Sequence, residues 1–399
     1  MRIGFDVSQT GSSKAGCGYF ADSLVQHLAR IDTENSYILY PTFGDFYWDP
    51  DWPRSTRQIN RPNVARGLGH TTFEAARLFW RDPAPDIETQ LGNPDIIHAN
   101  NFYCPPGMNT ARLVYTLHDL AFLEHPEWTT EENRIGCFTG VFNASLYAGC
   151  IIAVSHYTRR SFLEIFPHYP PDQVVVIYPA SRFSGGSELA RPRGLAPLRS
   201  SQFWLSVSTF EPRKNHRRLL AAYAKLKANI EEPLPLVLAG GPGWLMDGFE
   251  DTVSDLGLTR DVVMLGYVDD TMLEWLYQNC FGFLYPSLFE GFGLPVVEAM
   301  TLGAPVICAG NTSLPEIVGH AGLLVDPYDE GEIFRAMLKL SLGQVNRQTL
   351  KEDALRRAKR FSWSRTAEIV LDLYEEVVAQ RPGCAGSGPG DPLTSKCRR

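Results

Sequence analysis

Short apolar segments alternate with helical segments along most of the chain. In the first half, uninterrupted runs rich in Val, Ile and Tyr occupy residues 3–7, 36–40, 95–100, 112–119, 149–155 and 173–179. Such runs are typical of parallel strands that helices cover on both faces. After the first run comes a segment with several glycines, and Leu24, Val25 and Leu28 then fall at helical spacing. The order strand, glycine loop, helix predicts a doubly wound α/β domain.

A second series of the same kind begins near residue 203. Its apolar runs occupy residues 203–209, 234–240, 262–268, 281–287, 304–310 and 321–327, with helical segments such as 216–228 between them. Residues 180–200 separate the two series and are rich in Gly, Pro, Ser and Arg, which is the composition of a linker. We therefore predict one Rossmann-like domain over residues 1–185 and another over 186–380. Two such domains imply a ligand cleft between them, at the carboxyl ends of the strands.

Three further segments have less regular patterns. Residues 332–342 and 365–379 have helical patterns, and the second is a candidate to pack back on the N-terminal domain. Residues 381–399 have the composition of a disordered tail. Residues 42–94 contain aromatics and prolines without a clean period, which fits an acceptor-binding excursion or a long loop with one helix.

Composition excludes several classes of protein. With 44% hydrophobic and 21% charged residues the chain has an ordinary globular balance. The net charge of -8, from 37 basic and 45 acidic residues, gives no general attraction for nucleic acid or anionic membrane. Eight cysteines without a CxxC pair or a Cys/His cluster argue against structural zinc. No signal-peptide pattern and no run approaching ~20 apolar residues is present, so we expect a cytoplasmic protein.

The densest chemical signal is LYPSLFEGFGLPVVEAMTLGAPVI, residues 284–307. Glu290 follows a strand end in a loop where Gly291 and Gly293 free the backbone, and Pro295 suits the first turn of a helix. We expect the amides of Phe292, Gly293 and Leu294 to point out of that helix start, where its partial positive charge favours an anion.

Glu298 lies eight residues after Glu290. We expect it near the first turn of the helix, so that both carboxylates face one cleft. A carboxylate accepts two hydrogen bonds from a vicinal diol, as in a ribose or a sugar. The structural alternative is that Glu298 caps the helix electrostatically while Glu290 is merely solvated.

The segment EGFGLPVVEA resembles the E-x7-E motif of retaining glycosyltransferases of family 4. That family has the GT-B fold, in which two Rossmann-like doubly wound parallel-sheet domains face an interdomain cleft. The resemblance covers the chain apart from its tail and is closest between residues 200 and 330. It implies that Glu290 contacts the donor sugar and Glu298 the ribose of the nucleotide.

A basic pair follows the first strand of the second series, in STFEPRKNHRRLL. Arg213 and Lys214 would supply fixed positive charge to a diphosphate, whereas a basic helix start without an anion is disfavoured by the helix dipole. The segment resembles the family's E-P-R-K element, whose Lys grips the donor diphosphate. Many members have an Arg a few residues earlier, where this chain has Thr209. The prediction therefore rests more on Lys214, with Arg213 as the weaker candidate.

His118 follows an apolar strand in LVYTLHDLAF and is expected at the sheet edge that faces the cleft. The segment looks like the family's strand-His-Asp element, whose His reaches the donor sugar and the reaction centre. Asp119 either orients the ring or caps the following turn, and we favour capping.

The N-terminal glycine segment admits two interpretations. Gly16, Gly18 and Ala21 spell GxGxxA after a strand, as in a dinucleotide fingerprint, but the second strand ends without the expected acidic residue. The segment instead resembles the family's G-x-G-x-Y loop, which implies close approach of Gly16 and Gly18 to acceptor or phosphate. Asp49-Pro50-Asp51 matches the D-x-D of metal-dependent transferases but lacks a preceding strand, so we interpret it as coincidental.

Weaker candidates complete the predicted site. Ser155 resembles the family's V-S segment at a helix start, although helix capping explains it equally well. Gly240, Gly266 and Tyr267 follow strands of the second series and are candidates to line the base pocket.

Together these features predict a metal-independent retaining hexosyltransferase, in which His118, Lys214 and Glu290 are catalytic and no cofactor is needed. The resemblance points to mannosyltransferase-like members of bacterial polysaccharide biosynthesis, hence to GDP-mannose, with a UDP-sugar as the alternative donor. The expected acceptor is a hydroxyl of a glycan or lipid-linked saccharide, with peripheral association at the inner face of the membrane. Alternatives from other classes are a nicotinamide-dependent oxidoreductase and a catalytically silent nucleotide-sugar-binding protein.

Overall fold

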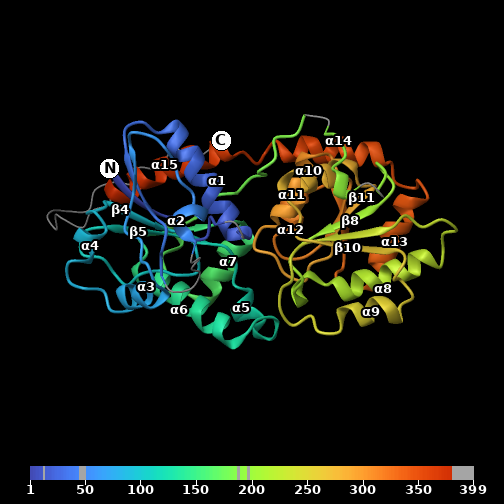
Figure 1. Cartoon of the computed structure of the whole chain (residues 1–399), viewed down its shortest axis with the longest axis horizontal. Coiled ribbons are helices and arrows are strands. Elements are labelled where there is room, and N and C mark those ends of the chain that lie inside the picture. The colour runs from blue at the N-terminus through green and yellow to red at the C-terminus, as the bar shows by residue number, and fades with distance from the viewer. Residues whose placement is uncertain (12–13, 45–50, 187–188, 196–197, 380–399) are drawn as a thin grey trace, which may run out of the picture.

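Two parallel β-sheets, each with helices on both faces, lie side by side in the computed structural model (Figure 1). The structure describes residues 1–11, 14–44, 51–186, 189–195 and 198–379, so the predicted tail and residues Asp49 and Pro50 lie outside the described residues. The first sheet has seven strands in the order β3-β2-β1-β4-β5-β6-β7. The second has six, in the order β10-β9-β8-β11-β12-β13. We call the two halves the N-lobe and the C-lobe.

The strands are short and mostly buried, as expected of sheets covered on both faces. Those of the N-lobe are β1 (Arg2–Asp6), β2 (Ser36–Tyr40), β3 (Val64–Arg66), β4 (Ile96–Ala99), β5 (Arg112–Leu117), β6 (Cys150–Ala153) and β7 (Val174–Val176). Those of the C-lobe are β8 (Trp204–Val207), β9 (Leu236–Ala239), β10 (Val262–Gly266), β11 (Gly282–Tyr285), β12 (Val306–Ala309) and β13 (Gly322–Val325).

Helices connect successive strands. The N-lobe contains α1 (Gly16–Ile31), α2 (Trp52–Ser55), α3 (Phe73–Arg81), α4 (Ile87–Gln90), α5 (Ala121–Glu124), α6 (Glu131–Tyr147) and α7 (His156–Ile165). After β8 follow α8 (His216–Lys227), α9 (Phe249–Asp255), α10 (Asp270–Asn279), α11 (Leu294–Thr301), α12 (Leu314–Val318), α13 (Glu330–Ser341), α14 (Arg347–Ala358) and α15 (Trp363–Ala379).

Each of the twelve apolar runs in the sequence overlaps a strand, which confirms the predicted α/β class. The segment 42–94 differs from the expected single helix, because it holds β3, α2, α3 and α4. β3 has only three residues, all at least partly exposed, and therefore leaves no apolar run in the sequence. The helix α14 was also missed, since it buries only Leu350, Ala354 and Ala358 along twelve residues.

The chain crosses between the lobes twice. Residues 177–203 run from β7 to β8, and the predicted boundary at 185 lies within this connecting segment. The last helix, α15, returns to the N-lobe and packs along α1, as Figure 1 shows by its red colour beside the blue helix. There the Tyr374 hydroxyl is 2.5 Å from Nδ1 of His98, a fully buried residue of β4.

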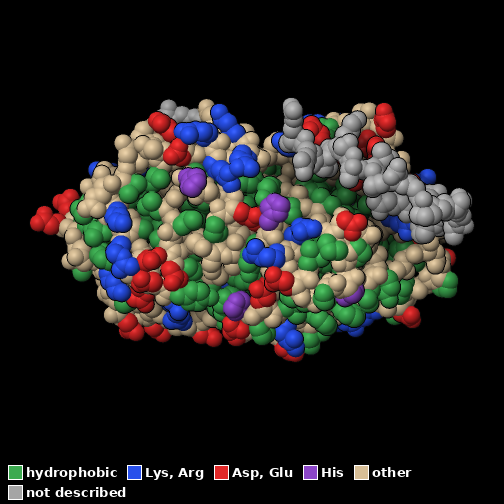
Figure 2. All heavy atoms as spheres, turned by 180° about the vertical axis from the view of Figure 1, so that it is seen from behind, with side chains coloured by type: hydrophobic (Ala, Val, Ile, Leu, Met, Phe, Trp, Pro, Cys, Tyr) green, Lys and Arg blue, Asp and Glu red, His purple; other side chains and the backbone are tan. Residues whose placement is uncertain are grey.

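The face of the molecule shown in Figure 2 has no dominant charge. In the view of Figure 2, basic and acidic side chains are interspersed over both lobes. None of the helices within the described ranges is at once long enough and apolar enough to span a bilayer.

Candidate active site

A cavity of about 420 Å³ lies between the two lobes, at the carboxyl ends of their central strands. Its N-lobe wall includes Gly16, Phe20, His118, Asp119, His125 and Trp128. Its C-lobe wall includes Ser208, Glu211, Arg213, Lys214, Trp244 and the segment from Glu290 to Pro295. The predicted catalytic carboxylate, Glu290, and the predicted catalytic histidine, His118, therefore line the same cavity from opposite lobes.

Glu290 is the best-anchored side chain of this cavity. Its Oε1 accepts hydrogen bonds from Nζ of Lys214 (2.6 Å), Oγ of Ser287 (2.6 Å) and the hydroxyl of Tyr285 (2.8 Å). Its Oε2 accepts one from Nη1 of Arg213 at 3.2 Å. Burial opposes ionisation, but Lys214 and Arg213 outweigh it and hold the pKa of Glu290 at about 2. Glu290 is therefore ionised throughout the physiological range.

Arg213 and Lys214 lie in a 3₁₀ turn, Pro212–Lys214, which precedes α8. We expected them to supply fixed positive charge to a diphosphate, and each is held in place by carboxylates within the cluster. Arg213 lies 2.8 Å from Glu211 as well as 3.2 Å from Glu290, and only 9% of the Lys214 side chain is exposed. Two cations thus balance two carboxylates, so a diphosphate would meet a cluster without net charge.

The start of α11 supplies positive potential from the backbone. Gly293 precedes the helix with φ at +97°, a conformation that favours glycine, and no side chain caps this helix start. Gly293 and Leu294 line the cavity, so the first amides of α11 meet it with the positive end of the helix dipole. Phe292 also lines the cavity, while its ring packs in the core against Tyr178 and Phe361, and the role of its amide stays a prediction.

His118 directly follows β5, and Nε2 of its ring is 2.7 Å from the carbonyl oxygen of Asn100. Because a carbonyl only accepts, Nε2 carries a proton, and Nδ1 is the acceptor when the ring is neutral. Burial lowers the pKa of His118, which favours that neutral ring. Asp119 accepts a hydrogen bond from the amide of Ala121 at 3.1 Å, which confirms its capping role.

Glu298 lies elsewhere than predicted. It is in the second turn of α11, buried, and absent from the walls of the cavity that Glu290 lines. The Tyr277 hydroxyl donates to its Oε2 at 3.2 Å, and Nε of Arg182 is 3.2 Å from its Oε1. Burial raises the pKa of Glu298 to about 7 although Arg182 acts in the opposite direction. The expectation that both carboxylates face one cavity is therefore wrong for the structure as it stands.

The predicted glycine loop is also different, because α1 already begins at Gly16. Gly16 lines the cavity, and a Cβ there would meet nothing within 4 Å, so its backbone is open to a ligand. A Cβ at Gly18 would overlap the carbonyl of Gln9, which makes that glycine a packing requirement. Ser155 is fully buried and accepts a hydrogen bond from the Thr158 amide at 3.0 Å. It caps α7 and does not line the cavity, contrary to its assignment to an acceptor or phosphate loop.

Gly240 and Gly266 lie at the ends of β9 and β10, where the Gly240 amide donates to the Gly266 carbonyl at 2.8 Å. Both have positive φ angles, and Tyr267 beside them is 62% exposed. None of the three lines the cavity between the lobes. Their role in a base pocket stays a prediction.

Sequence motifs did not reveal the aromatic wall of the cavity. Nε1 of Trp244 in the C-lobe donates to the carbonyl of Trp128 in the N-lobe at 2.7 Å, and His125 stacks on Trp128 at 3.9 Å between ring centroids. Trp244 lies four residues after Gly240, the predicted end of a strand, and that position was the available signal in the sequence.

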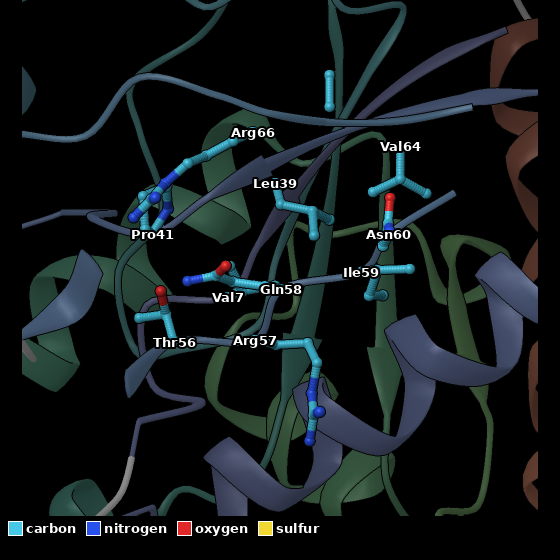
Figure 3. Close-up of a pocket in the computed structure, with 11 residues that line it drawn as sticks. Val7, Leu39, Pro41, Thr56, Arg57, Gln58, Ile59, Asn60, Val64 and Arg66 are labelled. Carbon is cyan, nitrogen blue, oxygen red and sulfur yellow. The ribbon is translucent and has the colours of Figure 1, made fainter. Parts of the chain in front are cut away.

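A second cavity, of about 410 Å³, opens at the carboxyl ends of β1, β2 and β3 (Figure 3). Its walls combine apolar residues such as Val7 and Leu39 with the polar side chains of Thr56, Gln58 and Asn60. The guanidinium of Arg57 points away from Leu39 (Figure 3). It pairs with Asp22 of α1, where Nη2 of Arg57 donates to Oδ2 of Asp22 at 2.7 Å.

Comparison with known proteins identifies the family. The model described as Glycosyltransferase Family 4 matches residues 16–180, and the model described as Glycosyl transferases group 1 matches residues 195–357. The O-antigen chain mannosyltransferase B of Escherichia coli is 35% identical over 290 residues, which is 70% of this chain and 74% of that protein. The chain belongs to glycosyltransferase family 4. Membership of this family disfavours the nicotinamide-dependent oxidoreductase as an alternative.

Two further comparisons extend this result to other relatives and to the fold. The glycosyltransferase is 37% identical over 180 residues to the serotype-specific mannosyltransferase WbdA of Escherichia coli, which is 44% of this chain but only 22% of WbdA. Its fold matches Anabaena HepE in complex with UDP and glucose with a TM-score of 0.69, at 19% identity over 94% of this chain and 100% of the other. The fold is therefore GT-B, and the family transfers a sugar from a nucleotide-sugar donor.

Proposed function

We propose that this glycosyltransferase moves mannose from GDP-mannose to a hydroxyl of a glycan or lipid-linked saccharide, with retention of configuration. The observation that carries the proposal is the cavity in which ionised Glu290 and the start of α11 meet His118 of the opposite lobe. The two mannosyltransferase relatives support mannose as the sugar.

In the proposed mechanism the chain stabilises the departing diphosphate without a metal. Negative charge develops on that group as the sugar bond breaks, and the start of α11 and Lys214, which both line the cavity, would stabilise it. Binding of the diphosphate would draw Lys214 and Arg213 partly away from Glu290 and Glu211. Glu290 would then accept hydrogen bonds from hydroxyls of the sugar, as the family resemblance implies.

A same-face displacement fits the site better than a covalent glycosyl-enzyme. A carboxylate nucleophile needs a lone pair free to attack the sugar carbon. Oε1 of Glu290 instead accepts hydrogen bonds from Ser287 and Tyr285, neither of which is a cation that a diphosphate would draw away. Closure of the lobes through Trp244 and Trp128 would keep water from the reacting sugar.

The acceptor belongs to the N-lobe in this proposal. The cavity of Figure 3 is lined by the polar residues Thr56, Gln58 and Asn60 and by Arg66 beside apolar side chains, a mixture that suits a saccharide. It lies at the carboxyl edge of the N-lobe sheet, the edge from which His118 also reaches the interlobe cavity.

A thermal-shift comparison of GDP-mannose, GDP, UDP-glucose, UDP and ADP-glucose tests the donor assignment, because a ligand that binds only the folded state raises its stability. We expect GDP-mannose and GDP to raise Tm, with and without EDTA, and the other compounds to have little effect. A shift with UDP-glucose alone would replace the donor by the UDP-sugar alternative, which the likeness to HepE supports. GDP-mannose that binds but stays intact with every lipid-linked acceptor tried would support the silent binding protein.

A further inference from the structure

Arg182 is a buried cation of the connecting segment that the motifs did not reveal. Its side chain is 15% exposed and faces two carboxylates of the C-lobe, with Nε 3.2 Å from Glu298 and Nη1 3.5 Å from Asp270. Ser181 and Phe183 fix its backbone, because the Ser181 hydroxyl accepts from the Phe183 amide at 2.9 Å. The position of the guanidinium is therefore fixed by buried contacts with Glu298 and by the local backbone.

The same guanidinium also contacts the N-lobe. It stacks on the ring of Tyr19 in α1, 3.7 Å from the ring centroid, a geometry that stabilises a cation on an aromatic face. Tyr267, the exposed residue that follows β10, is one of the neighbours that raise the pKa of the Tyr19 hydroxyl. Arg182 thus joins α1, the connecting segment and α11 at one point.

A ligand can reach this point. Arg182, Tyr19 and Asp270 line a cavity of about 940 Å³ that also exposes Lys14. The cavity is bounded by α1 on one side and by the connecting segment on the other. Glu298 itself is buried and lines neither this cavity nor the one that contains Glu290, so Arg182 is the residue that connects it to the larger cavity.

We propose that Arg182 is a positioning residue for the donor: it keeps Glu298 charged for the ribose hydroxyls and ties that carboxylate to Tyr19 of the opposite lobe. The inference rests on the proposed role of Glu298 in donor binding. It adds a residue from the connecting segment to the nucleotide side of the site, and it makes nucleotide binding depend on the placement of α1.

The charges around Glu298 support this role. Arg182 is the cation facing the carboxylate, while Asp270 and the hydroxyl of Tyr277 approach it from α10. Burial raises the pKa of Glu298 to about 7, Arg182 and the Tyr277 hydrogen bond lower it, and Asp270 raises it. Without Arg182 the pKa would be higher still, so Glu298 would be largely protonated at neutral pH and a weaker acceptor for a diol.

The test measures GDP affinity by calorimetry from about pH 6 to about pH 9 in Arg182→Met, Arg182→Lys and the unchanged enzyme. In the unchanged enzyme affinity should rise with pH through the pKa of Glu298. In Arg182→Met it should be weaker by about fivefold near pH 7, as for an upward shift of one pKa unit from about 7, and should approach the unchanged enzyme near pH 9. Arg182→Lys, which keeps the charge, should restore most of the affinity.

Two controls separate the possible outcomes. Arg335→Met removes an exposed arginine whose partner is Asp329, and should leave the profile unchanged. If Arg182→Met weakens GDP equally at every pH, or not at all, Arg182 is structural and the inference is overturned. If Glu298→Gln binds GDP as tightly as the unchanged enzyme at every pH, the donor role of Glu298 itself fails.

Discussion

Glu290 carries a buried negative charge that opposes the positive charges of Lys214 and Arg213. Glu290→Gln keeps the size of the side chain but leaves these two cations balanced by Glu211 alone. GDP should therefore bind at least as tightly as to the unchanged enzyme, whereas transfer should fall by about 100-fold or more, as for loss of an electrostatic contact to a transition state.

Calorimetry with GDP and a transfer assay with GDP-mannose check the two halves of this prediction separately. Glu330→Gln is a matched control, because Glu330 forms a half-exposed ion pair with Lys225 on the outer face of the C-lobe. Transfer at the rate of the unchanged enzyme in Glu290→Gln would remove Glu290 from the mechanism.

The sequence placed some of these residues at the cavity correctly and misplaced another. Glu290, Lys214 and His118 follow strand ends closely, so a local pattern sufficed to place them at the cleft. Glu298 was misplaced because its surroundings depend on Arg182 and Tyr277, which come from other parts of the chain. No local pattern reports such a distant partner.

At the scale of elements, the loop between β11 and α11 is fitted against the N-lobe. A Cβ at Gly291 would overlap the carbonyl of His118, and the Gly291 carbonyl accepts a hydrogen bond from Thr158 of α7 at 3.1 Å. Gly291→Ala should therefore push the lobes apart while each lobe stays folded. Because small misplacements at a reaction centre cost up to about 100-fold, transfer should fall at least about tenfold.

Gly241→Ala provides the matched control, since a Cβ there meets nothing within 4 Å. Circular dichroism should be unchanged in both variants, and small-angle scattering should show a more open shape for Gly291→Ala alone. Full activity of Gly291→Ala with an unchanged scattering curve would contradict the proposed fit between the lobes.

The elements themselves were predictable where they are buried. Continuous apolar runs marked twelve strands because both faces of each sheet are covered. β3 at the sheet edge and the mostly polar α14 lack that signature, and the glycines of α1 suggested a loop where a helix had already begun.

At the scale of the whole molecule, the last helix, α15, packs on the N-lobe, which is formed by the first half of the chain. Helix α15 buries Trp363, Val370, Leu373 and Tyr374 against the N-lobe. Each large apolar side chain contributes about 1.5–3 kcal/mol when fully buried, so the helix supplies a large share of the roughly 5–15 kcal/mol that stabilises a domain.

A chain that ends at Ser362 should therefore lose N-lobe structure although every strand of that lobe remains. Guanidinium unfolding followed by far-UV circular dichroism should show a lower midpoint and a less cooperative transition than the full chain. Removal of residues 381–399 is the control and should leave the midpoint unchanged. Equal midpoints for all three chains would show that α15 is dispensable for the N-lobe.

The proposed retaining transfer of mannose is tested most directly by NMR, which gives the anomeric configuration of the product. The enzyme is incubated with GDP-α-mannose, EDTA and a lipid-linked saccharide acceptor, with Glu290→Gln in parallel. We expect an α-mannoside and free GDP from the unchanged enzyme, and almost no product from the variant. A β-mannoside, or transfer from UDP-glucose but not from GDP-mannose, would contradict the proposed function.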